Sequence, residues 1–133
     1  MTASSGDPMT RKRQADAIIE TAARQLRDLL HEAVAQFDPF PPFPGAFFTY
    51  GIEVEGGAAE SRERGCVVLA ADGDLYELEV SMDPSRQSMD PVGGRDEKLK
   101  KLDLHPRDYI LYACDALTKV TELLLEQEAA GRA

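Results

Sequence analysis

The chain has 133 residues, of which 43% are hydrophobic and 29% are charged. This length and composition are typical of a single globular domain over residues 1–133, and they exclude wholesale disorder, a collagen-like repeat and a coiled-coil rod. Fifteen lysines and arginines stand against twenty-four aspartates and glutamates, which gives a net charge of −9 at pH 7. An acidic chain of this kind argues against binding to nucleic acid or to an anionic membrane.

No segment has the form of a membrane span or a secretion signal. The longest unbroken apolar run covers six residues, 66–71, whereas a bilayer needs about 20. The N-terminus has a basic cluster followed by mixed polar and apolar residues instead of an apolar core.

Cys66 and Cys114 lie 48 positions apart in apolar stretches, which is typical of reduced core thiols. We therefore expect a cytoplasmic protein.

A long helix is predicted over residues 8–37. The helix can start at Asp7 followed by Pro8, or alternatively at Thr10, and apolar residues then recur every three or four positions from Ala15 to Ala33. This spacing predicts one buried and one exposed face. The apolar stripe begins late, so residues 1–10 are expected to form a flexible N-terminus.

The segment from Phe37 to Tyr50 reads FDPFPPFPGAFFTY and holds six of the nine aromatic residues and half of the prolines. Its prolines favour an extended path. The phenylalanines either cover this protein's own core, which we expect, or dock in a groove of a partner. Exposure of so many phenylalanines would make a monomer prone to aggregate.

Three antiparallel strands are predicted in the middle of the chain. Apolar and polar residues alternate over residues 48–55, as in a half-buried strand. Residues 66–71 and 75–81 form two more strands, joined by Asp72-Gly73, which is a strong hairpin signal.

A two-residue turn at Asp72-Gly73 fixes the register of this predicted hairpin. It pairs Leu69 with Tyr76, and it requires a positive φ at both turn residues. The expected core face then carries Val67, Leu69, Tyr76, Leu78 and Val80.

Residues 82–104 lack a clear periodicity and are expected to form a long loop, in which 96–102 could form a short helix. The sequence SMDP occurs twice, at 81–84 and 88–91. We interpret the repeat as turn chemistry. The alternative is a loop that binds a ligand or partner, because loops this long are often functional. The candidate binding residues are Asp83, Arg86, Asp90 and Arg95.

The last predicted helix begins at Pro106, with apolar residues on more than one side. The fold class is therefore α+β, a three-stranded antiparallel meander flanked by a long N-terminal and a C-terminal helix (α-β-β-β-α).

In element order, acidity and size the chain resembles the small dimeric chaperones of bacterial secretion systems. The resemblance implies two further strands before the last helix, which the sequence does not show.

The sequence predicts no catalytic residue, no metal site and no cofactor. His31 and His105 are the only histidines, and neither belongs to a recognisable catalytic arrangement. The glutamates at 53, 55, 77 and 79 alternate along strands and are interpreted as a solvated acidic rim instead of cation ligands.

The leading functional hypothesis is a small acidic interaction or regulatory module, a non-enzymatic homodimer. The alternatives are a small-ligand-binding protein or enzyme that uses the loop after the third strand, and a chaperone-like binder of a partner protein. Homodimerisation follows from counting apolar faces, since two helices cannot cover both faces of the central strand and all sides of the last helix. The candidate interface residues are Val68 and Leu75 on the sheet, or Leu123 and Leu125 on the helix.

Overall fold

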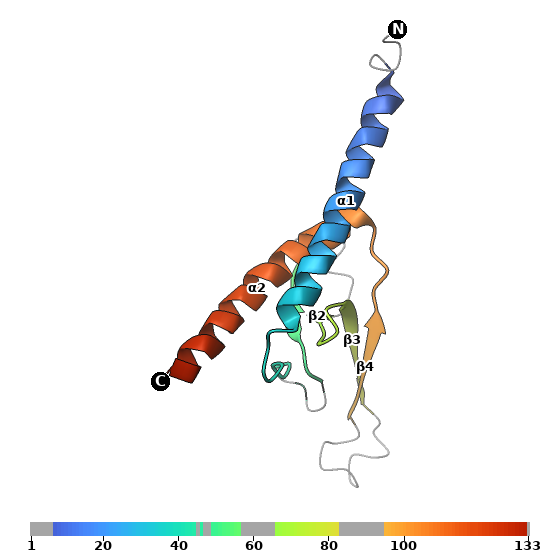
Figure 1. Cartoon of the computed structure of the whole chain (residues 1–133). Helices are drawn as coiled ribbons and strands as arrows, with labels where there is room; N and C mark the ends of the chain where they lie inside the picture. The colour runs from blue at the N-terminus through green and yellow to red at the C-terminus, as the bar shows by residue number, and fades with distance from the viewer. Residues whose placement is uncertain (1–6, 45, 47–48, 57–65, 83–94, 133) are drawn as a thin grey trace.

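The computed structural model describes residues 7–44, 46, 49–56, 66–82 and 95–132. Two helices and a four-stranded antiparallel sheet follow in the order α-β-β-β-β-α, and the strands are neighbours in chain order. The helices pack against each other and against one side of the sheet (Figure 1). The predicted α+β class is confirmed, but the expected count of three strands is wrong. The elements are α1 (Pro8–Val34), β1 (Ile52–Val54), β2 (Cys66–Leu69), β3 (Leu75–Met82), β4 (Arg95–Lys101) and α2 (Pro106–Arg132).

Helix α1 begins where the sequence predicts. The Asp7 side chain accepts a hydrogen bond from the Met9 N–H, and Pro8 occupies the first turn, so α1 already includes residues expected in a flexible terminus. The regular helix ends at Val34, three residues before the expected end. The N–H groups of Gln36 and Phe37 then donate to carbonyls three residues back. This tighter turn leads into Asp38-Pro39, where a helix cannot continue.

The turn between β2 and β3 contains three residues, not two. The Ala70 N–H donates to the Asp74 carbonyl (3.0 Å) and the Gly73 N–H to the Ala70 carbonyl (2.9 Å), so Ala71, Asp72 and Gly73 form the turn. Gly73 alone among the described residues has a positive φ, +87°. The expected turn with two positive φ angles is therefore wrong, whereas the requirement for glycine at position 73 is confirmed.

The extra turn residue shifts the hairpin register by one and turns β3 over. Leu69 pairs with Leu75 and Val68 with Tyr76, instead of Leu69 with Tyr76 as expected. Since the side-chain period of a strand is two, a shift of one residue exchanges its faces. Leu75 therefore lies in the main core under the helices. Leu78 is buried as predicted, but on the other side of the sheet beside Val68. The predicted core position of Tyr76 and Val80 is wrong, since Tyr76 is only half-buried and Val80 is 46% exposed.

Strand β4 occupies residues that were expected to form a loop and a short helix. It pairs with β3 from Met82–Arg95 to Tyr76–Lys101. Lys98 and Lys100 lie opposite Glu79 and Glu77, and opposite charges on facing positions favour a strand pair. Lysines are also common on edge strands, because they discourage pairing with another chain.

The main core lies between the helices and the sheet. It contains Ile52 and Val54 of β1, Val67 and Leu69 of β2, Leu75 of β3, and Leu30, Val34, Ala113, Ala116 and Val120 of the helices. On the other side of the sheet Phe43 packs against Val68 and Leu78 and is itself 8% exposed. The expectation that the proline-rich segment covers this protein's own core is confirmed at Phe43. Phe40 also contributes, since its ring contacts that of Phe37 edge to face.

Strand β1 is shorter than the predicted strand over 48–55, and α2 covers its backbone. The Lys119 ammonium donates to the Glu53 carbonyl (3.0 Å), and the Glu55 N–H donates to the Asp115 carboxylate (2.8 Å). Lys119 and Asp115 form an ion pair one turn apart on α2. The helix thus satisfies backbone groups that an edge strand would leave open. Phe48 lies outside the described residues.

Neither helix in the described part of the chain combines the length and apolarity needed to cross a membrane.

We predict that Gly73→Ala destabilises the fold by about 1–3 kcal/mol, because an L side chain resists a φ of +87°. A β-carbon at this position would also lie 2.3 Å from the His31 ring and 3.0 Å from the His31 Cα. Chemical denaturation measures the difference. The matched control is Gly131→Ala, where a β-carbon meets no atom within 4 Å. Equal stability of the two variants would contradict the positive φ at Gly73 and its close approach to His31.

Candidate functional site

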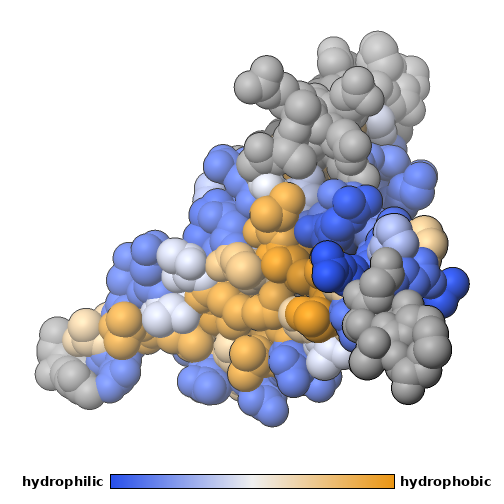
Figure 2. All heavy atoms as spheres, turned by 90° about the horizontal axis from the view of Figure 1, so that it is seen from above, coloured by the Kyte–Doolittle hydropathy of each residue, from blue (hydrophilic) through white to orange (hydrophobic). Residues whose placement is uncertain are grey.

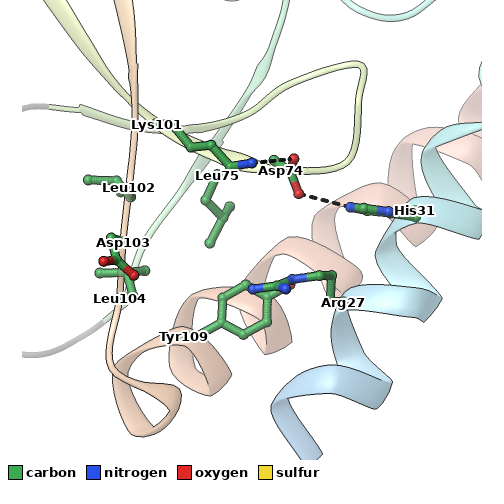
Figure 3. Close-up of a pocket in the computed structure, with 9 residues that line it drawn as sticks. All are labelled: Arg27, His31, Asp74, Leu75, Lys101, Leu102, Asp103, Leu104 and Tyr109. Atoms are coloured by element: carbon green, nitrogen blue, oxygen red, sulfur yellow. Dashed lines mark hydrogen bonds and ion pairs between the residues drawn. The ribbon is translucent and has the colours of Figure 1, made fainter.

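A cavity of about 300 Å³ lies where α1, the β2–β3 turn, the end of β4 and the start of α2 meet (Figure 3). Its polar wall is formed by Arg27, His31, Asp74, Lys101 and Asp103, and its apolar wall by Leu75, Leu102, Leu104 and Tyr109. Leu75 and Tyr109 are 4% and 9% exposed, so the floor of the cavity is anchored in the main core. We call it the junction cavity.

Asp74 connects three elements at the rim of this cavity. Its Oδ1 lies 2.9 Å from His31 Nε2 on α1, and its Oδ2 lies 3.2 Å from Lys101 Nζ on β4. The Asp74 N–H donates to the Asp72 carboxylate (2.8 Å), which holds the turn in shape. The second oxygen of Asp72 accepts a hydrogen bond from the Tyr76 hydroxyl.

These contacts change two pKa values. Partial burial on its own would raise the pKa of Asp74, but the hydrogen bonds from His31 and Lys101 outweigh it and hold this pKa below its ordinary value. For Tyr76, the hydrogen bond to Asp72 and partial burial raise the pKa to about 12. Asp74 is therefore a structural anion, and Tyr76 keeps its proton under physiological conditions.

Arg27 and Tyr109 form the opposite rim of the junction cavity. The guanidinium carbon of Arg27 lies 5.5 Å from the centre of the Tyr109 ring, which is within the range of a cation–π contact. Burial raises the pKa of the Tyr109 hydroxyl, although the nearby charge of Arg27 opposes the shift. No carboxylate in the described part of the chain forms an ion pair with Arg27.

Of the binding residues predicted from the sequence, only Arg95 lies among the described residues, and it does not line this cavity. Asp83, Arg86 and Asp90 lie outside the described residues, as does most of the SMDP repeat. Arg95 begins β4, opposite Met82. Sequence reasoning missed Arg27, Asp74, Lys101 and Tyr109. These positions are far apart in the chain, and the only local signal was the turn at Asp72-Gly73.

The four candidate interface residues have different environments. Val68 is fully buried and Leu75 is 4% exposed, so neither can contact a second chain in this conformation. The sheet alternative fails because Phe43 covers Val68 and the helices cover Leu75. Leu123 is half-buried against the main core, whereas Leu125 is 59% exposed.

Both helices have an apolar side next to the side that faces the sheet, and part of it packs against the main core (Leu26, Ala33, Ile110, Leu117 and Leu124). On α1 the sheet side carries His31, and on α2 it carries Asp115 and Lys119. At helical spacing, the apolar sides contain no charged residue over 15–33 of α1 and 110–125 of α2, whereas Arg11, Arg107 and Glu128 continue the same sides toward the helix ends. The uncharged stretches consist of Ala15, Ile18, Ala22, Leu26, Leu29 and Ala33 on α1, and Ile110, Leu111, Cys114, Leu117, Thr118, Thr121, Leu124 and Leu125 on α2. We call these residues the outer helix face.

Large side chains of the outer helix face are open to solvent. Ile18 is 69% exposed, Leu29 50% and Leu111 48%. Seen from above, the molecule shows an extensive apolar area that continues toward the C-terminal end of α2 (Figure 2). An apolar area of this kind is typical of an interaction surface.

Both cysteines are free and exposed, so the expectation that they are core thiols is wrong. Cys114 belongs to the outer helix face, and Cys66 starts β2.

No group of three metal-ligating side chains occurs among the residues that the structure describes. His105 accepts a hydrogen bond from the Arg107 N–H at the start of α2 (3.2 Å).

No protein-family model matches the sequence, and no curated protein and no solved structure is similar enough to match.

We predict that Asp74→Asn lowers the free energy of unfolding by about 1 kcal/mol near neutral pH. The pKa of Asp74 is lower in the folded than in the unfolded chain, so its contribution is present above the unfolded pKa and is lost as the pH falls through the folded pKa. The gap between wild type and variant should therefore close in acid. Denaturation curves from pH 7 to pH 3 test this.

The control for this experiment is Asp103→Asn, which removes an exposed carboxylate from the same cavity. It should leave the stability within about 0.5 kcal/mol of wild type. A gap for Asp74→Asn that stayed constant down to pH 3 would show that its charge does not hold the turn to α1 and β4.

Proposed function

We propose that this protein is a non-enzymatic interaction module that works as a homodimer through its outer helix face. The observation that carries the proposal is the absence of charge on that face. In a chain with 29% charged residues, fourteen positions spread over both helices are all apolar or uncharged, and several are about half exposed or more. Such a face gains free energy when another apolar surface covers it.

The size of the face allows a small dimer interface. It covers residues 15–33 of α1 and 110–125 of α2, which are about 28 Å and about 24 Å long and about 10 Å wide. The two stripes together therefore offer roughly 500 Å², below the area of about 800 Å² that each partner buries in a standard interface. One more peptide segment would cover only part of this area.

The order of side chains on α2 favours a second copy as the partner. Leu111 and Leu125 lie seven residues before and after Thr118. When two α2 helices cross antiparallel at Thr118, Leu111 of each copy meets Leu125 of the other. A two-fold interface requires this kind of self-complementary patch. The resulting dimer has its helices inside and its two sheets outside.

We predict that the wild type is a dimer at tens of micromolar and that Leu125→Glu or Leu111→Glu makes it monomeric. Either change places a carboxylate where association would remove it from water, which costs several kcal/mol. Sedimentation velocity measures the mass. The matched control is Val80→Glu, because Val80 is 46% exposed and Leu111 48%, but Val80 lies on the sheet. A monomeric wild type would contradict the proposal.

A second test of the proposed dimer compares the alkylation rates of the two cysteine thiols. Cys114 lies on the outer helix face and Cys66 does not, while both are exposed in the single chain. In the dimer, alkylation of Cys114 should therefore be at least tenfold slower than that of Cys66. The Leu125→Glu variant should restore the Cys114 rate without changing the Cys66 rate. Equal rates for the two thiols in the wild type would place the interface elsewhere.

A further inference from the structure

We propose that the junction cavity binds a small molecule with one carboxylate and a compact apolar body. The cavity opens where α1, β4 and the start of α2 meet the β2–β3 turn (Figure 3). It is lined by the sheet side of α1, so it does not include the outer helix face. The inference is therefore independent of the proposed dimer.

Arg27 is the group that would receive the carboxylate. The other basic side chains of the rim, His31 and Lys101, are already held by Asp74. Arg27 has no ion pair in the described part of the chain, and the face of the Tyr109 ring supports its guanidinium. A guanidinium has several N–H groups, so those that do not face Tyr109 can pair with a planar anion, and a carboxylate matches their geometry.

The rest of the cavity selects an apolar body of limited size. Leu75 and the Tyr109 ring form its buried floor, and Leu102 and Leu104 are half-buried beside them. A cavity of about 300 Å³ is at the lower end of the range for small-molecule sites. It fits a branched aliphatic or small aromatic group.

The arrangement of charges favours one of two sources of this chemistry. In Figure 3 the Asp103 side chain lies on the opposite side of the cavity from Arg27. A free amino acid carries its ammonium on the carbon next to its carboxylate, so with the carboxylate at Arg27 the ammonium could not reach Asp103, and a simple carboxylic acid fits better. Both ligands share the carboxylate and the apolar body.

The test is a titration of the full chain with 4-methylpentanoate, L-leucine and 3-methylbutylamine, followed by NMR chemical shifts and calorimetry. The two carboxylates should bind saturably, with shifts at Tyr109 and Leu75, and the amine should not. Arg27→Gln should weaken carboxylate binding at least tenfold, since it removes a charged hydrogen-bond donor. Arg24→Gln, one turn earlier on α1 and outside the cavity lining, should leave it unchanged.

The source follows from comparing the two carboxylates. Tighter binding of 4-methylpentanoate than of leucine indicates a simple carboxylic acid, and tighter binding of leucine indicates an amino acid. The proposal is overturned if neither carboxylate saturates below about 10 mM, if the amine binds equally well, or if Arg27→Gln binds like wild type. The Leu125→Glu variant should bind as wild type does, so a failed dimer and a failed cavity are distinguished.

Discussion

The hydrogen bond from the Gly73 N–H to the Ala70 carbonyl closes a three-residue turn, and most of the architecture depends on that turn length. It sets the β2–β3 register, and the register decides which side of β3 faces the helices. Leu75 enters the main core, while Leu78 joins the smaller cluster under Phe43. The turn can form only because Gly73 accepts a positive φ and has no side chain to collide with His31.

The same turn attaches the sheet to α1. It places Asp74 where His31 and Lys101 both reach its carboxylate, so one side chain joins a helix, a turn and an edge strand. The His31 and Lys101 side chains are 42% and 67% exposed, so water screens these contacts and each contributes about 0.2–1 kcal/mol. They also hold His31 and Lys101 away from the centre of the junction cavity. Arg27 is therefore the cationic group of the rim that stays open to an incoming anion.

Local sequence patterns predicted the individual helices and strands better than the way in which they pair and pack. The helix start at Asp7-Pro8, the α2 start at Pro106 and the hairpin between 66 and 81 all followed from short-range chemistry. Asp-Gly, however, suits turns of two or three residues equally, because glycine supplies the positive φ in both. Strand β4 was missed since DEKLKK is also a good helix former, and only its pairing with β3 decides the outcome. The junction cavity joins residues 27, 74, 101 and 109, whose proximity exists only after folding.

Side chains protect the backbone at both edges of the sheet, and this favours association through the helices over pairing between sheets. Strand addition needs free backbone groups at an edge. At β1, side chains of α2 occupy the Glu53 carbonyl and the Glu55 N–H. At β4, Lys98, Lys100 and Lys101 would have to lose hydration beside an incoming strand. Both edges therefore oppose the addition of another strand. The outer helix face carries no such penalty, because its side chains have no charge to desolvate and apolar area to bury.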